Sequence, residues 1–315
     1  MIAIALTGGG NRGPLQVGAL QALFAHGIWP DFVVGTSAGA LNAIYLAADG
    51  TPAATDRLIE VWRSVNFKSV YAGNIFQIVW RFLRGDDSFY SSANMRQIIA
   101  SHLDPLARTY ADLKLPCYIT TSDLRTNRLL LFPDENDKSA ALVDSVLASA
   151  SLPGLHPPVI FGDTQLVDGG VVDNVPAGIA MAKGATVIYL LNVGYGGTSE
   201  GQAKGVSQIL LRTLNTFTAQ SLFQDLERAS ADPAIQLHYI HLNDLADISF
   251  TDFSHVDAMV EAGRNTAERY LRNPQPVRPT ATPAEASARS AQESARSVPH
   301  LRGAQPFTPS YRRTP

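Results

Sequence analysis

Two stretches near the N-terminus decide the fold, and each is an apolar strand that runs through glycines into a helix. Residues 2–14 read IAIALTGGGNRGP, and residues 32–39 read FVVGTSAG. Pro14 suits the first turn of a helix, because the amide hydrogen that proline lacks is not needed there. Small residues continue from 38 to 48 as a second helix. This repeated order of strand, turn and helix predicts an α/β protein with a layered sheet.

The same alternation continues along the chain. Further strands are predicted at residues 117–122, 128–132, 165–168, 186–192 and 236–242. Helices are predicted at residues 51–65, 140–150, 206–228 and 253–272, with Thr51 as the N-cap and Pro52 as the first helical residue of the first of them.

The first glycine turn, Gly8–Gly13, contains the G-x-G-x-x-G pattern of a dinucleotide site. That interpretation fails on geometry, since the ribose-binding acid belongs at the carboxyl end of the second strand. Asp31 stands at the start of that strand instead.

The second turn has the G-x-S-x-G form of a nucleophile elbow, with Ser37 between Gly35 and Gly39. A side chain at either glycine would collide across so sharp a turn. Attack by a serine on an ester builds an oxyanion, which backbone N–H groups at a helix N-terminus stabilise. If the first two strands are neighbours, Gly8–Gly13 lies beside Ser37 and is better explained as an oxyanion hole.

A candidate base follows in residues 166–176, which read LVDGGVVDNVP. Asp168 ends an apolar strand and precedes two glycines, so its carboxylate has little steric cover on a tight turn. A simple Asx-turn explains the same pattern and remains an alternative for this piece alone.

Taken in order, GGGNRG at 8–13, GTSAG at 35–39 and DGG at 168–170 resemble the patatin-like phospholipases. The resemblance covers roughly residues 1–192 and includes residues 148–157, ASASLPGLHP, and the D-G-G-x-x-x-N-x-P form of residues 168–176. It implies a three-layer patatin-like fold, with a mostly parallel central sheet and helices on both faces.

The resemblance also implies the roles of individual residues. Ser37 would be the nucleophile and Asp168 the base of a dyad without histidine. The backbone of Gly8, Gly9, Gly10, Asn11, Arg12 and Gly13 would form the oxyanion hole, supported by the motif residues Gly35, Gly39, Gly169, Gly170 and Asn174. No cofactor and no metal are expected.

These features predict a serine hydrolase that cleaves esters of phospholipids or other acyl lipids. Three alternatives remain open: an acyltransferase of the same fold, a catalytically dead lipid-binding regulator, and an α/β-hydrolase with a Ser-Asp-His triad. His238, His241 or His255 would complete that triad. His156 departs from the family, which often has an aromatic residue there, and is expected to alter the wall along which the acyl chain enters.

A cap or lid is expected within residues 66–115. There, residues 74–84 place polar side chains at 74, 77, 81 and 84, opposite a wide apolar face. This pattern is typical of an interfacial helix or lid, with lipid contact by Ile75, Phe76, Trp80 and Phe82. A core helix of the cap is the alternative.

Composition bounds the setting of the protein. Charged residues make up 17% of the chain, and the single cysteine, Cys117, excludes an intramolecular disulfide framework. We expect a catalytic domain at 1–272 and a disordered basic tail at 273–315, which holds six arginines and two acids.

The acidic body argues against nucleic acid as a partner. Since neither a leader nor a membrane span is recognisable, a cytoplasmic protein with transient membrane-surface contact is predicted. No oligomeric state is indicated.

Overall fold

The computed structural model describes residues 1–71, 73, 75–134, 138–193, 202, 206–245, 248–249 and 251–277. These residues belong to one compact unit. The strands are β1 (Ile2–Leu6), β2 (Phe32–Gly35), β3 (Cys117–Asp123), β4 (Arg128–Phe132), β5 (Val159–Phe161), β6 (Thr164–Asp168), β7 (Val187–Asn192) and β8 (Gln236–His241). The helices are α1 (Gly13–Ala25), α2 (Ala38–Asp49), α3 (Ala54–Ser64), α4 (Phe67–Val70), α5 (Ile75–Arg84), α6 (Ala93–Leu103), α7 (Leu142–Ser149), α8 (Ala177–Ala182), α9 (Val206–Ala231) and α10 (Val256–Arg272).

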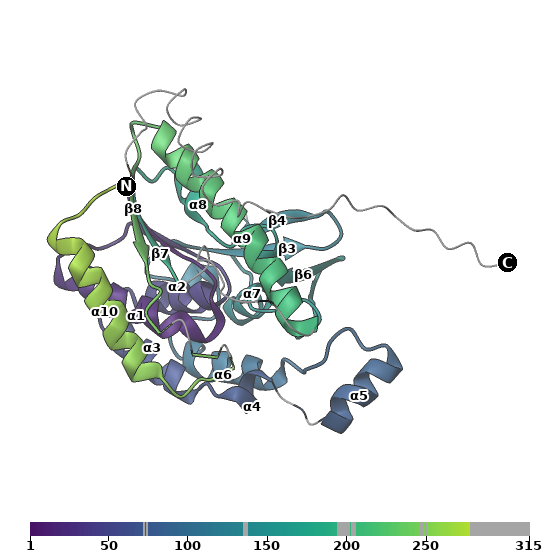
Figure 1. Ribbon diagram of the computed structural model, residues 1–315. Coiled ribbons are helices and arrows are strands. Elements are labelled where there is room, and N and C mark those ends of the chain that lie inside the picture. The colour runs from purple at the N-terminus through teal and green to yellow at the C-terminus, as the bar shows by residue number, and fades with distance from the viewer. Residues whose placement is uncertain are drawn as a thin grey trace, which may run out of the picture. The chain divides into compact units, whose positions relative to one another are not determined.

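The strands form one eight-stranded sheet in the order β5-β6-β3-β2-β1-β7-β8, and β4 pairs with β3 off this path (Figure 1). β1, β2, β3, β7 and β8 run parallel to one another. β4 and β6 run antiparallel to β3, and β5 runs antiparallel to β6. The predicted mostly parallel sheet is therefore confirmed, as is the expectation that the first two strands are neighbours.

Both faces of the sheet are buried, as the alternation along β1 shows. Ile4 and Leu6 belong to a cluster with residues of α1, α2, α3 and α10, whereas Ala3 and Ala5 belong to a second cluster with residues of α8 and α9. Successive side chains of a strand point to opposite faces, so the helices cover both faces in three layers. The predicted fold class is confirmed.

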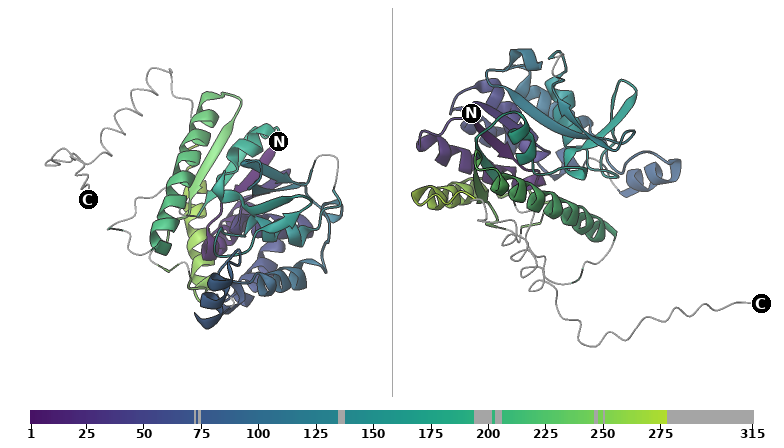
Figure 2. Two further views of the ribbon diagram at one scale, coloured as in Figure 1. Left: turned by 90° about the vertical axis from the view of Figure 1, so that its right-hand side faces the viewer. Right: turned by 90° about the horizontal axis from the view of Figure 1, so that it is seen from above.

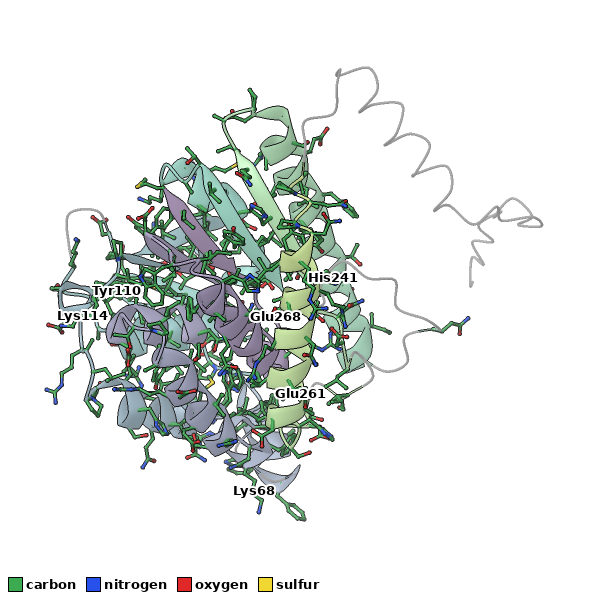
Figure 3. All side chains as sticks on the ribbon, turned by 90° about the vertical axis from the view of Figure 1, so that its left-hand side faces the viewer. Lys68, Tyr110, Lys114, His241, Glu261 and Glu268 are labelled. Carbon is green, nitrogen blue, oxygen red and sulfur yellow. The ribbon has the colours of Figure 1, made fainter. Side chains whose placement is uncertain are left out.

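The outer helix α10 packs on α1 at backbone distance. A Cβ atom on Gly18 would lie 1.8 Å from the Val260 carbonyl oxygen, and one on Gly263 would lie 1.9 Å from the Leu15 carbonyl oxygen. Farther along α10, Glu268, labelled in Figure 3, lies 3.0 Å from the Nε2 of His26, just past the end of α1. This close packing positions α1, whose N-terminus carries the glycine turn of the site.

Every strand and helix expected from the sequence is present, with boundaries that differ by a few residues. The expected cap at Thr51 is wrong: α3 begins at Ala54, and the Thr51 hydroxyl donates to Asp49 instead. Because that side chain is engaged with the preceding helix, Thr51 and Pro52 form a turn before α3. Elements that the sequence did not indicate are β5, α4, α6, α8 and three short 3-10 helices.

The chain remains attached to the sheet slightly beyond the expected domain boundary at 272. The Val277 N–H donates to the Leu237 carbonyl on β8, at 2.8 Å. From residue 278 onward, the basic tail that the composition predicts lies outside the described residues.

Candidate active site

Ser37 stands on a strained turn between β2 and α2. Its φ of 54° and ψ of −120° are unusual for a residue with a side chain. A Cβ atom on Gly35 would lie 2.3 Å from the Gly39 carbonyl oxygen, and one on Gly39 would lie 2.2 Å from the Leu6 carbonyl oxygen. Both glycines are therefore required for the chain to pass this turn so close to β1.

The ends of β2 and β6 meet along one edge of β3. β2 pairs with β3 up to Gly35 opposite Ile119, and β6 ends with Asp168 opposite Thr121. Because β4 occupies the opposite edge of β3 from Ile119 to Asp123, β2 and β6 must share the other edge. One runs parallel and the other antiparallel to β3, so their carboxyl ends approach head to head. This topology brings Ser37 and Asp168 together from positions 131 residues apart in the chain.

The Asp168 carboxylate is buried, with a relative exposure of 2%. The Gly170 N–H donates to its Oδ1 at 2.8 Å, whereas its Oδ2 has no hydrogen-bond partner among the described residues. Burial raises the pKa of Asp168 to about 6, against the opposing effects of the Ser37 hydroxyl and the Gly170 amide. The free oxygen atom and the raised pKa suit a proton acceptor for the adjacent hydroxyl.

Asn174 ties the glycine turn to the loop after β6. Its Oδ1 accepts the Gly8 N–H at 3.1 Å, and its Nδ2 donates to the Gly8 carbonyl at 3.3 Å. A Cβ atom on Gly8 would lie 2.2 Å from this Oδ1 and 2.9 Å from the Ser37 Cβ, and one on Gly170 would lie 2.8 Å from the same Oδ1. The absence of side chains at Gly8 and Gly170, in two different motifs, therefore leaves the space that the Asn174 side chain occupies.

The structure narrows the set of N–H groups in the turn that are free for an oxyanion. The Gly8 N–H is held by an asparagine, the Arg12 N–H donates to the Gly9 carbonyl at 3.2 Å, and the Gly13 N–H donates to the Gly10 carbonyl. These three N–H groups therefore already have acceptors within the chain. The N–H groups of Gly9, Gly10 and Asn11 have no acceptor among the described residues.

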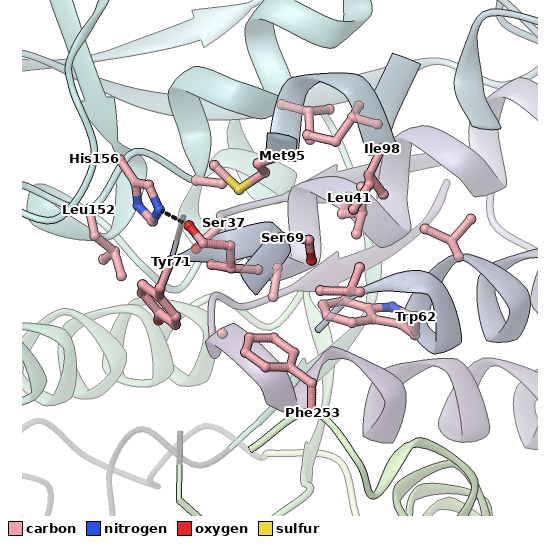
Figure 4. A pocket seen from close by; sticks show the side chains of 18 residues that line it. Ser37, Leu41, Trp62, Ser69, Tyr71, Met95, Ile98, Leu152, His156 and Phe253 are labelled. Carbon is pink, nitrogen blue, oxygen red and sulfur yellow. Dashed lines mark hydrogen bonds between the residues drawn. The ribbon is translucent and has the colours of Figure 1, made fainter. Parts of the chain in front are cut away.

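An apolar pocket opens beside Ser37 (Figure 4). The cap region predicted at 66–115 contributes to its wall. The pocket is lined by Gly10, Ser37, Ala38, Leu41, Val61, Trp62, Val65, Ser69, Val70, Tyr71, Met95, Ile98, Ile99, Val146, Ala150, Leu152, His156 and Phe253.

His156 is part of this wall and is buried. Its Nε2 donates to the Val70 carbonyl at 2.8 Å (Figure 4), and its ring stacks on Tyr71 with centroids 5.8 Å apart. Burial lowers the pKa of His156, so the ring is neutral at pH 7. The residue that departs from the family pattern therefore presents a neutral, stacked ring to the pocket.

The three histidines of the alternative triad have other partners. His238 stacks on Tyr189 with centroids 4.4 Å apart, and its Nδ1 lies 3.0 Å from the Tyr270 hydroxyl. His241 stacks on Tyr239 with centroids 5.9 Å apart, although its Nε2 has no hydrogen-bond partner among the described residues, and His255 pairs with Asp252. Within the part of the chain that the structure describes, no hydrogen bond or ion pair joins any of the three to Ser37 or Asp168.

Helix α5 projects from the sheet and its covering helices (Figures 1 and 2). Phe76, Trp80 and Leu83 recur on one helical face and are 82%, 61% and 71% exposed. Arg81, from the opposite stripe, donates to the Ser88 carbonyl at 2.9 Å. The described apolar side chains therefore face outward, contrary to the core-helix alternative. The side chains of Ile75 and Phe82 lie outside the described residues.

The sequence reasoning missed several residues that support the site. The Asn42 amide donates to the Gly13 carbonyl at 3.0 Å and accepts from the Trp62 indole at 2.9 Å. Ser149, within the block at 148–157, accepts the Ser37 N–H. Asn42 lies in the small-residue helix and Ser149 in residues 148–157. Their hydrogen-bond partners are distant in sequence, so no local pattern indicated these contacts.

None of the helices among the described residues combines the length and the apolar character that a membrane span needs. Nor do these residues contain a group of three or more His, Cys, Asp or Glu residues that is suited to hold a metal ion.

Comparisons with known proteins place most of the chain in one family. The family model described as patatin-like phospholipase matches residues 4–181, which is more than half of the chain. Lysophospholipase NTE1 of Mycosarcoma maydis is 27% identical over 201 residues, covering 61% of this chain and 10% of that protein. Patatin-like phospholipase domain-containing protein 7 of Rattus norvegicus is 31% identical over 195 residues, covering 61% of this chain and 14% of that protein.

Among solved structures, VipD from Legionella pneumophila aligns with a TM-score of 0.47 and 15% identity, covering 86% of this chain and 66% of that one. The matched region spans only 10% of the Mycosarcoma maydis protein and 14% of the Rattus norvegicus protein, so this chain corresponds to a small part of these relatives.

Proposed function

Because this chain belongs to the patatin-like phospholipase family, we propose that it hydrolyses the carboxylic esters of acyl lipids, with phospholipids as the leading substrate class. Ser37 is the nucleophile and Asp168 the general base. The observation that carries the proposal is the meeting of a strained serine with a buried carboxylate of raised pKa, beside an apolar pocket.

Acylation begins when Ser37 Oγ attacks the ester carbonyl carbon and Asp168 accepts the hydroxyl proton. The carbonyl oxygen becomes an oxyanion, which the N–H groups of Gly9, Gly10 and Asn11 stabilise. The protonated Asp168 then donates its proton to the departing alcohol oxygen as the C–O bond breaks. The acyl group remains on Ser37.

Deacylation repeats these steps with water. Asp168 accepts a proton from the attacking water, a second oxyanion forms in the same place, and the proton returns to Ser37 Oγ as the carboxylic acid leaves. A pKa of about 6 makes Asp168 a stronger base than an ordinary aspartate. It remains far weaker than an alkoxide, so proton transfer accompanies formation of the C–O bond.

The pocket supports a substrate with a hydrocarbon chain. Its wall near Ser37 is formed by Leu41, Val146, Leu152 and Tyr71, among other apolar side chains. An acyl chain in this wall gains roughly 0.8 kcal/mol for each CH₂ group that leaves water. The pocket therefore favours long acyl esters over short ones, through KM more than through kcat.

The first test compares wild type with Ser37→Ala and Asp168→Asn on p-nitrophenyl esters of increasing chain length and on lysophosphatidylcholine. Removing either member of a nucleophile–base pair is expected to lower kcat by about 10³-fold or more. Fluorophosphonate labelling at Ser37 should be fast in wild type, much slower in Asp168→Asn, which lacks the base that activates the hydroxyl, and absent in Ser37→Ala.

The matched controls are His238→Ala, His241→Ala and His255→Ala, which should retain activity because other residues engage these histidines. If Asp168→Asn keeps its activity while one of these variants loses it, the dyad is wrong and the triad alternative replaces it.

We propose further that the exposed face of α5 binds the lipid surface from which the substrate is drawn. Phe76, Trp80 and Leu83 form a contiguous apolar face, and an amphipathic helix of this kind lies with that face in the headgroup boundary. The side chain of Arg84 on the same helix is 65% exposed and lies 3.9 Å from Asp86, and its exposed guanidinium adds attraction to anionic lipid. The cap region that carries α5 also lines the pocket.

Trp80→Asp tests this surface. Losing the burial of one large apolar side chain in lipid should weaken vesicle binding by about 10-fold or more. Activity on phosphatidylcholine–phosphatidylglycerol vesicles should fall accordingly, while activity on a soluble short-chain ester stays unchanged.

Ile160→Asp on β5 is the control, because Ile160 is 65% exposed but lies on a strand of the sheet and not on α5. Equal losses of Trp80→Asp on vesicles and on the soluble ester would show that α5 has no role at the lipid surface.

A further inference from the structure

The C-terminal end of α7 contacts both halves of the candidate dyad through hydrogen bonds. The Ser37 N–H donates to the Ser149 Oγ at 2.8 Å, and the Asp168 N–H donates to the Ser151 carbonyl at 2.9 Å. Ser149 and Ser151 are both completely buried. A segment of three residues therefore holds the backbone of the nucleophile and of the base.

This contact matters because no ladder hydrogen bond joins the two strands that carry the dyad. β2 and β6 each pair with β3, and they meet end to end rather than side by side. On the other side of the elbow, a hydrogen bond of 2.6 Å joins the Thr36 and Thr120 hydroxyls. The distance between Ser37 and Asp168 thus depends on what bridges the strand ends, and α7 supplies that bridge.

The Ser37 backbone gives the bond a specific task. At a φ of 54°, the N–H of Ser37 points away from the ordinary partners of a strand or a helix. A partly buried N–H without an acceptor is unfavourable, so loss of the Ser149 oxygen favours a rotation of this peptide. Such a rotation moves Ser37 Oγ relative to the Asp168 carboxylate and the oxyanion N–H groups.

We propose that Ser149 is a positioning residue for catalysis: its hydroxyl oxygen holds the strained peptide of Ser37 so that the nucleophile faces Asp168. The inference rests on the function proposed above. Ser149 does not line the pocket, although its neighbours Val146 and Ala150 do. Its loss is therefore expressed in kcat and not in the KM for the substrate.

Ser151 supplies a matched control from the same turn. Its Oγ donates to the Leu147 carbonyl at 2.8 Å, within its own helix end, and its bond to Asp168 uses the backbone carbonyl. Ser151→Ala therefore removes a buried hydroxyl at equal depth but keeps the contact to Asp168. The two alanine variants differ in whether Ser37 loses its acceptor.

The experiment measures kcat and KM for a soluble p-nitrophenyl ester, with the thermal midpoint, for wild type, Ser149→Ala, Ser151→Ala and Ser37→Ala. Ser149→Ala is expected to lower kcat by about 10- to 100-fold, the effect of a small misplacement of a reacting group, with KM within about twofold. Ser151→Ala, which keeps the backbone bond to Asp168, should lower kcat by a much smaller factor than Ser149→Ala. Equal kcat values for Ser149→Ala and Ser151→Ala would overturn the inference.

A second pair of variants separates the hydroxyl from packing and from folding. Ser149→Thr and Ser149→Val add the same volume, and Thr keeps the acceptor. We expect the Thr variant to be about 10-fold or more faster in kcat than the Val variant, and equal rates would contradict a positioning role. Activity retained by Ser37→Ala would instead refute the proposed function itself, which keeps the two failures distinct.

Discussion

At the scale of single residues, the proposed chemistry depends on one carboxylate in an apolar setting. Asp168 is buried, and its Oδ2 lacks a partner among the described residues. Desolvation disfavours the charged form and raises the pKa to about 6, so the base gains strength from the surroundings that bury it. The free energy lost when this carboxylate is buried therefore makes Asp168 a stronger base.

The pH dependence of activity follows with a definite sign. Asp168 must be ionised to accept a proton, so kcat/KM should be lost as the pH falls through about 6 and reach a plateau above it. A pH–rate profile on a soluble ester from pH 4 to 9 checks this. A limb near pH 4, as for an ordinary aspartate, would contradict the raised pKa.

The control for that profile is Asp173, five residues further on. Burial and the neighbouring Asp225 raise the pKa of Asp173 to about 7, so it titrates in the same window. Asp173→Asn should leave the acid limb near pH 6. A limb that disappears in this variant would assign the titration to Asp173 rather than to the base.

The residue types in a motif indicate its chemistry more directly than they indicate which residues it contacts in the folded chain. Ser37 and Asp168 were recognisable because glycines flank both and each ends an apolar strand. The pairing of Gly8 with Asn174 was not, because an amide that reaches a residue 166 positions away leaves no local pattern. The number of free N–H groups in the turn therefore became evident from the fold.

At the scale of elements, the elbow depends on how closely α2 approaches β1. The Cβ position of Gly39 lies 2.2 Å from the Leu6 carbonyl oxygen, which is backbone and cannot move aside. Gly39→Ala should therefore lower the free energy of unfolding by more than about 3 kcal/mol, measured by urea titration.

Gly27→Ala is the comparison for this prediction. Gly27 has a φ of 72° with nothing within 4 Å of its Cβ position, so alanine there meets strain without a clash. Its cost should be about 1 kcal/mol. Similar losses in the two variants would argue against the close approach of α2 to β1.

Elements with strong periodicity or clear boundaries were predictable, and those without were not. β5 has three residues, and α8 has six, too few to show a pattern. α6 carries Asn94, Gln97, Ser101 and His102 within eleven residues, so its apolar positions do not form a clean stripe. Packing of Ile99 and Leu103 into the main hydrophobic core stabilises it as a helix.

At the scale of the whole molecule, the C-terminal boundary of the compact unit can be tested. Val277 pairs with Leu237 on β8, whereas residue 272 ends α10. Truncation after Arg278 should preserve the thermal midpoint and the activity on a soluble ester. Truncation after Arg272 removes the backbone bond to β8 and should lower the midpoint by about 2–4 °C for each kcal/mol lost. Equal midpoints for the two truncations would place the boundary at 272.

The sequence by itself determined the α/β class, most of the elements, the family resemblance and the identity of the candidate nucleophile and base. Those properties are local, because apolar alternation, glycines at tight turns and short motifs are written in neighbouring residues. The tertiary structure decided how β2 and β6 meet along one edge of β3, which N–H groups of the glycine turn are free, and that Ser149 holds Ser37. It also turned the described aromatic side chains of α5 outward. Each of these depends on contacts between residues distant in the chain, which a pattern of neighbours does not record.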